Sequence, residues 1–479
     1  MLFFCLCFIF LSLKNIFFIR FLGLMAAFIL CGWSFFLIIK IFNYSFWYEG
    51  IFFIKNDLIS KSLNFCILVD IFSILLICLT CILCFICIIV CWNINNKINL
   101  LYFLIFLITF LLIIAFCVVD LLLFYIFFEA VLIPIYLIIG VWGTRNRKIT
   151  AAYRLFMYTL IGSIFFLSII IYIYFIYGIT DIYILKYLIN YTQINESLLW
   201  FGLFIAFAIK MPVYPLHTWL PEAHAEAPTV GSILLAGILL KLGPYGLIRF
   251  SNFLLPYGLF FWRPFLFLIS LLGLYYTSII ALRQIDIKKI IAYSSIGHMG
   301  LILLGLLSIT FEGFLGSFIL IIAHGFVSAG LFLIVGLLYD RLKTRIFFYY
   351  KGLIQIYPIL SFLFFLFIIG NIGFPSTLNF LAEFLIIISL FELNSYMCCL
   401  VVFSSIFVLS FNLYLYSRIF YGAIEMKKKY IKYNEDLNYR EFCSIIILII
   451  PIFNFGIIGN NLIFFINKNL IFYLNNLVM

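Results

Sequence analysis

Six ionisable side chains lie inside long apolar stretches of the chain, where charged groups are rare. A lysine at the centre of a bilayer costs about 3 kcal/mol on insertion scales, so such residues usually mark ion or proton pathways. Burial shifts the pKa values of lysines and carboxylates toward neutral pH, and histidine titrates near neutral pH without such a shift. A lateral proton relay is therefore predicted, and its members in chain order are Glu129, Lys210, Lys241, His298, His324 and Glu383. The alternative is that these groups only hydrogen-bond between helices.

Two of the six accompany interrupted helices. Lys210 ends an apolar run and is followed by Met211-Pro212, with Pro215 shortly beyond. Proline removes a backbone donor, and broken helices at membrane depth survive only where protein or water satisfies the freed groups. Glu383 follows a second break, in the sequence GFPSTLN. Interrupted segments in both halves of a chain are typical of inverted-repeat transporters with a site near the midplane.

The polar turn PLHTWLPEAHAEAP resembles a metal-binding spacing, H-x4-E-x-H. It contains His217, Glu222, His224 and Glu226. Two prolines interrupt any helix that would align these side chains, so capping and loop hydrogen bonds are favoured over a metal site.

Four cysteines, Cys81, Cys84, Cys87 and Cys91, have the spacing C-x2-C-x2-C-x3-C of ferredoxin cluster ligands. They lie inside an apolar span, where thiolates are costly and a neutral thiol behaves as a small hydrophobe. The residue after the last cysteine is tryptophan rather than proline. Buried thiols are therefore the favoured interpretation, and no disulfide is expected.

The elements that carry these residues must be membrane helices. Of the 479 residues, 67% are hydrophobic and only 10% are charged, which no soluble domain matches. The net charge of +11 is dispersed over short loops, so it indicates membrane orientation and no nucleic-acid partner. No cleavable signal or transit peptide is evident, so a mitochondrial location would imply synthesis inside the organelle.

Apolar runs of spanning length predict an all-α polytopic protein with about 14 transmembrane helices. The first run, at residues 2–13, is short. The twelfth span is expected to be one discontinuous helix, which is made of the runs 353–372 and 380–390. The other runs are 16–39, 64–91, 98–119, 121–141, 152–177, 198–215, 230–247, 260–282, 290–307, 313–338, 397–419 and 442–466.

The loop charges support this order of spans. Loops after odd-numbered spans hold twenty lysines and arginines, and the loops on the other side hold seven. This asymmetry predicts that the basic loops face the cytoplasm or, in an organelle, the matrix.

Four segments carry a resemblance to a known family. They are KMPVYPLHTWLPEAHAEAPTVGSILLAGILLKLGPYGLIRF, FEAVLIPIYLIIGVWG, DIKKIIAYSSIGHMG and IAHGFVSAGLF. The sequence closely resembles the proton-pumping antiporter-like subunits of respiratory complex I over residues 64–421. The resemblance implies fourteen helices with two inverted five-helix repeats. Two features depart from the family pattern: the N-terminus is short, and the usual glycine-rich turn before the second glutamate reads GFPSTLNF.

The resemblance also implies residue roles. Glu129 and Lys210 match a pair whose separation tunes the proton affinity of the lysine, and Lys241 matches a central relay lysine. His298 and His324 match the histidines of the polar axis, and Glu383 matches the terminal carboxylate. On this basis the chain divides into N-terminal spans and a polar loop (1–63), an antiporter-like core (64–421) and a polar connection with a C-terminal span (422–479).

The leading hypothesis is a proton-translocating subunit that holds no cofactor itself. The sequence contains no dinucleotide-binding fingerprint, so NADH, FMN, iron–sulfur clusters and ubiquinone are expected in partner subunits. Expected partners are other membrane-arm subunits, especially neighbouring antiporter-like ones, and lipids. The alternatives are a subunit of a multi-protein cation/proton antiporter, or a non-catalytic membrane scaffold.

Overall fold

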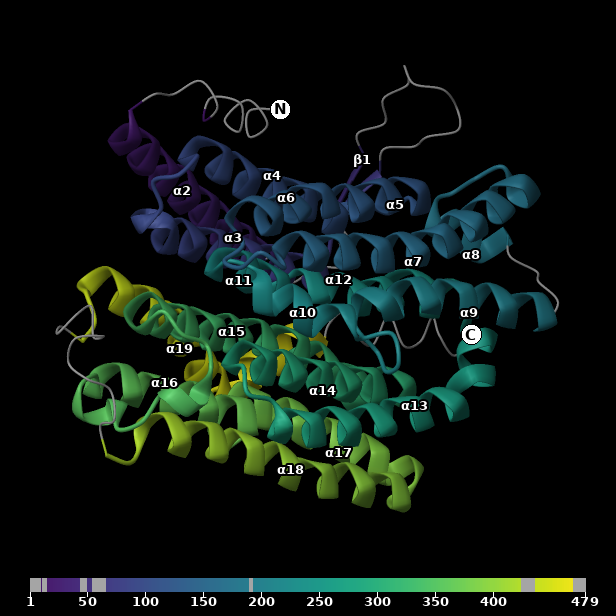
Figure 1. Cartoon of the computed structure of the whole chain (residues 1–479). Coiled ribbons are helices and arrows are strands. Elements are labelled where there is room, and N and C mark those ends of the chain that lie inside the picture. Colours follow the sequence, from purple (N-terminus) through teal and green to yellow (C-terminus); the bar gives the residue numbers. More distant parts are fainter. Residues whose placement is uncertain are drawn as a thin grey trace.

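The long apolar runs form helices that lie side by side in one bundle (Figure 1). The computed structural model describes residues 10, 15–43, 50–53, 66–188, 193–423 and 436–467. The α-helices are α2 (Ile16–Asn43), α3 (Ile71–Val90), α4 (Ile98–Cys117), α5 (Leu121–Ala130), α6 (Leu132–Trp142), α7 (Lys148–Tyr177), α8 (Ile182–Leu188), α9 (Gln193–Lys210), α10 (Trp219–Glu226), α11 (Thr229–Gly237), α12 (Leu242–Gly246), α13 (Pro256–Arg283), α14 (Ile287–Ser308), α15 (Phe311–Leu342), α16 (Pro358–Ile372), α17 (Leu378–Leu393), α18 (Ser395–Phe420) and α19 (Tyr439–Ile457).

Shorter elements join these helices. They are the 3-10 turns η1 (Cys91–Asn93), η2 (Leu239–Lys241), η4 (Phe347–Tyr349) and η5 (Leu353–Gln355), the π-helical segment η3 (Leu247–Asn252), and the strands β1 (Gly50–Phe53) and β2 (Cys66–Val69). The strands form one antiparallel pair, in which Gly50 lies opposite Val69.

The described part of the chain holds 11 helical segments that are long and apolar enough to cross a membrane. Each predicted span has a matching helix except the run 2–13, which lies outside the described residues apart from Phe10. The second break separates α16 from α17, so the predicted discontinuous helix is confirmed.

Three predicted spans differ in detail, and one of them, 230–247, is interrupted after Gly237. The run 64–91 becomes helical only at Ile71, because Asp70 caps α3 and the residues before it form β2. The Asp70 carboxylate accepts a hydrogen bond from Ser73 N at 2.8 Å, and the Ser73 hydroxyl accepts one from Asp70 N. The run 121–141 is divided at Val131 into α5 and α6.

Two sets of consecutive helices have similar packing partners. In the first half α7 packs against both α5–α6 and α9, and in the second half α15 packs against both α14 and α17. The first set comprises α4 to η3, and the second comprises α13 to α18. Helix α15 lies at the centre, in contact with α3, α11, α14, α16, α17 and α19, and its most apolar stretch is fully buried.

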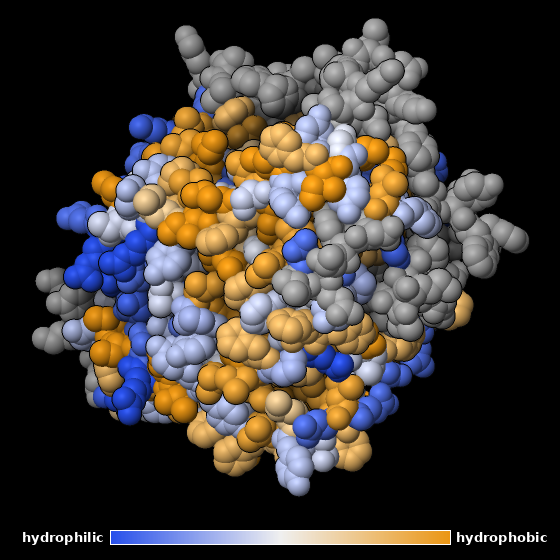
Figure 2. Space-filling view, turned by 90° about the vertical axis from the view of Figure 1, so that its right-hand side faces the viewer, coloured by the Kyte–Doolittle hydropathy of each residue, from blue (hydrophilic) through white to orange (hydrophobic). Residues whose placement is uncertain are grey.

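Loops that follow odd-numbered spans meet at one end of the bundle. Arg345 donates hydrogen bonds there to Thr144 and to the Ala225 carbonyl, and Arg145 lies 3.9 Å from Asp286. These contacts join three separate loops, which supports the order of spans deduced from loop charge. The opposite end faces the viewer in Figure 2, where hydrophobic side chains cover much of the surface between scattered hydrophilic ones.

Candidate functional site

Glu129 and Lys210 come together where two helices end. Glu129 is the penultimate residue of α5, and Lys210 is the last residue of α9. The Lys210 ammonium lies 3.6 Å from Glu129 Oε1, and the two side chains are only 6% and 17% exposed. It also donates a hydrogen bond to the Phe128 carbonyl. The predicted acid–base pair is therefore present as a buried, loosely spaced ion pair.

The break after Lys210 leaves carbonyl groups that need new partners. Pro212 has no N–H, so it cannot continue the helical hydrogen bonds. Val213 N donates to the Ala208 carbonyl at 3.0 Å, and the Trp219 indole donates to the Ile209 carbonyl at 3.0 Å. These contacts hold the end of α9 inside the bundle and fix the position of the lysine.

Lys241 also lies at an interruption. The predicted continuous span 230–247 is divided, because α11 ends at Gly237 and η2 is a tighter 3-10 turn. The interruption frees the Ala236 carbonyl, which accepts a hydrogen bond from Lys241 Nζ at 2.5 Å. This carbonyl partly replaces the water that a buried ammonium loses.

The other four predicted residues lie close together, in a series that runs from Lys241 of η2 into the second half. Lys241 Nζ lies 2.9 Å from His324 Nδ1, and the rings of His324 and His298 are 5.4 Å apart. His298 Nδ1 is 3.6 Å from Glu383 Oε1, and its Nε2 is 3.1 Å from Asn371 Oδ1. Alternating ring nitrogens, amine and carboxylate are suited to passing a proton along such a series.

Asn371 is a site residue that the sequence reasoning missed. It bonds His298 on one side, and its amide nitrogen donates to Asn412 Oδ1 at 2.9 Å on the other. The available signal was the position of Asn371, an amide in an apolar run directly before the break at Gly373.

A cavity of about 40 Å³ lies beside His298 and Glu383, between α13, α14, α16, α17 and α18. Its wall includes the hydroxyl-bearing residues Thr277, Ser278 and Ser404. A space of this size with hydroxyl groups and a carboxylate in its wall can hold water. The terminal carboxylate therefore faces a space in which it can exchange a proton.

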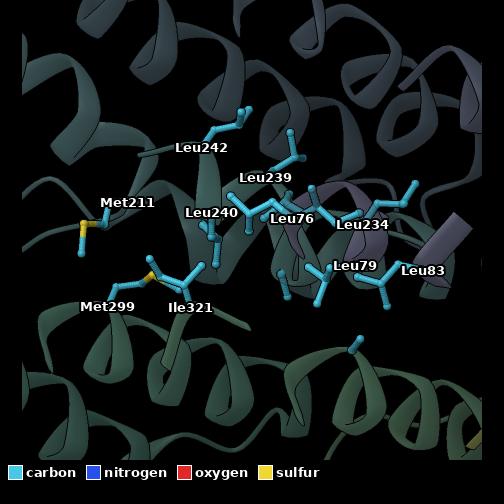
Figure 3. Close-up of a cluster of buried hydrophobic side chains, with 14 of the residues drawn as sticks. Leu76, Leu79, Leu83, Met211, Leu234, Leu239, Leu240, Leu242, Met299 and Ile321 are labelled. Carbon is cyan, nitrogen blue, oxygen red and sulfur yellow. The ribbon is translucent and has the colours of Figure 1, made fainter. Parts of the chain in front are cut away.

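The six residues fall into two groups, because no hydrogen bond or ion pair among the described residues joins Lys210 to Lys241. Met211 follows Lys210 in the chain and belongs to a cluster of buried apolar side chains that includes Met299 of α14 and Ile321 of α15 (Figure 3). The predicted relay is thus a pair and a series of four.

The structure of the polar turn PLHTWLPEAHAEAP differs from the prediction. Residues 219–226 form α10, which accommodates Pro221 because a proline is tolerated in the first turn of a helix. His224 makes no hydrogen bond through either ring nitrogen within the described residues, and its ring stacks on Phe332 at 4.5 Å. The prediction of capping or loop hydrogen bonds is therefore wrong for His224, because this side chain packs inside the bundle.

Neither suspected metal motif forms a cluster. Among the described residues, no group of three or more His, Cys, Asp or Glu side chains is placed to hold a metal ion. The four spaced cysteines are buried in α3 and η1.

Fold and site define a class of membrane protein. The family model described as "NADH:quinone oxidoreductase/Mrp antiporter, TM" matches residues 118–408. The chain belongs to this family and is a multi-pass membrane protein.

Similar proteins narrow the class. "NADH-ubiquinone oxidoreductase chain 4" of Chondrus crispus is 48% identical over 352 residues, which are 74% of this chain and 71% of the relative. The protein of that name from Acanthamoeba castellanii is 41% identical over 436 residues, or 91% of this chain and 86% of the relative. FEAVLIP and Glu383 predict subunit 4 among the antiporter-like subunits, and these relatives confirm that choice.

Solved structures agree. A chain of respiratory complex I from Thermus thermophilus with bound NADH has a TM-score of 0.87 at 26% identity, with 99% of each chain covered. A chain of the Mrp complex from Dietzia has a TM-score of 0.78 at 18% identity, covering 97% of this chain and 93% of that chain, which shows the shared fold alone.

Proposed function

We propose that this chain is a membrane-arm subunit of respiratory complex I and translocates protons across the mitochondrial inner membrane. NADH oxidation and ubiquinone reduction take place in partner subunits, which hold the FMN and iron–sulfur clusters, and this chain has no redox site. Neighbouring antiporter-like subunits and lipids cover its apolar sides. The basic loops face the matrix, and the gene lies in the organelle. The family match, the names of the relatives and the loop charges support this proposal.

The observation that carries the mechanism is the pairing of buried acids and bases at helix interruptions. Glu129 governs how firmly Lys210 keeps its proton, because the pair is separated by 3.6 Å in a buried site. When a neighbouring subunit draws Glu129 away or neutralises it, Lys210 becomes able to release its proton toward the second group. Lys241, His324 and His298 then carry the proton to Glu383.

Replacement of the first pair tests this proposal. Lys210→Ala and Glu129→Ala should lower proton-coupled NADH oxidation by roughly tenfold or more while the complex still assembles. Matched controls are Lys40→Ala and Glu392→Ala, which truncate exposed side chains of the same types. Normal coupled activity in an assembled Lys210→Ala complex would sink the relay assignment.

The competing function is a subunit of a cation/proton antiporter, which the shared Mrp-type fold keeps open. It predicts sodium flux driven by a pH gradient without any quinone reductase partner. Co-purification with flavin and iron–sulfur subunits separates complex I from this possibility. It also separates complex I from a membrane scaffold that stands apart from any redox complex.

A further inference from the structure

The Lys210 ammonium is closer to an aromatic ring than to its carboxylate partner. It lies 3.0 Å from the centre of the Phe128 ring, and it donates to the carbonyl of the same residue. Its distance to Glu129 Oε1 is 3.6 Å, and neither oxygen of Glu129 has a hydrogen-bond partner within the described residues. The ring and the carbonyl thus hold the cation at a position where the carboxylate is not hydrogen-bonded.

The Phe128 ring is fixed in this orientation by its neighbours. It is 1% exposed and meets the rings of Phe166 and Phe207 nearly edge-on, at 5.9 and 5.8 Å and angles of 85° and 87°. Phe124, one turn earlier on α5, lies 5.4 Å away. This aromatic cluster excludes water from the ring, and a cation–π contact is stronger where both partners are desolvated.

The order of residues in α5 places two partners for the cation side by side. Phe128 and Glu129 are consecutive, so their side chains leave the helix about 100° apart. A lysine side chain has enough rotatable bonds to reach both from one backbone position. The ammonium can therefore leave the carboxylate without becoming a buried charge that has no partner.

We infer that Phe128 is a positioning residue that holds protonated Lys210 when its ion pair with Glu129 opens. This inference rests on the proposed proton-transfer function and adds a specific step to it. The ring and the Phe128 carbonyl stabilise the open state of the pair. A cation–π contact at a desolvated site shifts the balance between open and closed states by roughly five- to thirtyfold.

The test compares three variants in the assembled complex. Phe128→Leu removes the ring while keeping an apolar side chain, and Phe128→Tyr retains an aromatic face. Phe124→Leu is the matched control, since it makes the same change on the same helix in an equally buried ring of the cluster. Proton-coupled NADH oxidation is measured in sealed membrane vesicles, and assembly is checked on native gels.

Phe128→Leu is expected to slow coupled turnover several-fold and Phe128→Tyr to keep most of it, whereas Phe124→Leu loosens the cluster but leaves the Phe128 ring in place and should slow turnover much less. Electron cryomicroscopy of the Phe128→Leu complex should show the Lys210–Glu129 pair drawn into hydrogen-bonding distance. Equal effects of Phe128→Leu and Phe124→Leu, or an unchanged ion pair, would overturn the inference. If Lys210→Ala also leaves coupled turnover unchanged, the proposed function itself fails. If only the Phe128 variants leave coupled turnover unchanged, the proposed function stands without this step.

Discussion

At the scale of residues, the site is two polar groups that no hydrogen bond or ion pair among the described residues joins. Lys210 has its partners in α5, whereas Lys241 has its partners in α11 and α15. Proton transfer between the lysines therefore requires water to enter or side chains to move.

Replacement of Asn371 tests the series in the second half. Asn371→Leu removes the partner of His298 Nε2, so the imidazole loses the contact that orients it toward Glu383. Coupled turnover should fall several-fold, as measured by proton uptake during NADH oxidation. Asn412→Leu removes only the outer partner and should have a milder effect. Normal coupled turnover in both variants would exclude a role for Asn371 and Asn412 in proton transfer.

The sequence was sufficient to find the six ionisable residues, because charged groups in apolar runs are costly enough to stand out. It was not sufficient to find Asn371, since a neutral amide carries a smaller insertion cost and resembles ordinary helix-to-helix bonding. Nor could it show that Lys210 and Lys241 have separate partners, because this depends on which helices pack together in the bundle.

At the scale of elements, the helix interruptions determine where Lys210, Lys241 and Glu383 lie. Hydropathy predicted the helices well, because a span must bury about 20 apolar residues whatever its neighbours are. It failed at Asp70, where a capping side chain decides the helix start, and at Val131 and Gly237, where helices change direction or pitch. Such local geometry depends on tertiary contacts that a single sequence does not reveal.

Gly373 lies at the break between α16 and α17, where a larger residue is expected to disturb the site. It ends α16 with a φ of +75°, and an added Cβ would lie 2.5 Å from Glu383 Oε2. Gly373→Ala should cost about 1–3 kcal/mol through backbone strain and should displace the carboxylate. Thermal unfolding and proton uptake of the purified complex measure both effects.

Gly140→Ala is the control for Gly373→Ala, because nothing lies within 4 Å of its added Cβ and its helix favours alanine. Unchanged unfolding temperature and pumping in Gly373→Ala would show that the second break does not depend on this glycine.

At the scale of the whole molecule, one end of the bundle is held together by a buried arginine. Arg345 follows α15, its side chain is 0% exposed, and it donates hydrogen bonds to Thr144 in the loop before α7 and to the Ala225 carbonyl in α10. Glu226 lies 4.0 Å away and is 8% exposed. These contacts tie α10 and the loop before α7 to the centre of the molecule.

Arg345→Ala should destabilise the chain by about 2–4 kcal/mol, because it leaves Glu226 buried without its charge partner and removes two hydrogen bonds. The amount of assembled complex and its unfolding temperature should both fall. Arg147→Ala, which truncates an exposed arginine at the same end, should leave both unchanged. Equal stability of the two variants would refute the role of Arg345 as a tie between loops.

The central claim is that the buried series of acids and bases carries protons. Its most direct test is the number of protons moved per NADH oxidised, together with the rate, in sealed vesicles that hold the assembled Lys241→Met complex. Methionine fills a similar volume, but it cannot carry a proton between the two groups. The account predicts a clear fall in both quantities beside a normal Lys40→Met control. An assembled Lys241→Met complex that pumps at the normal ratio and rate would contradict it.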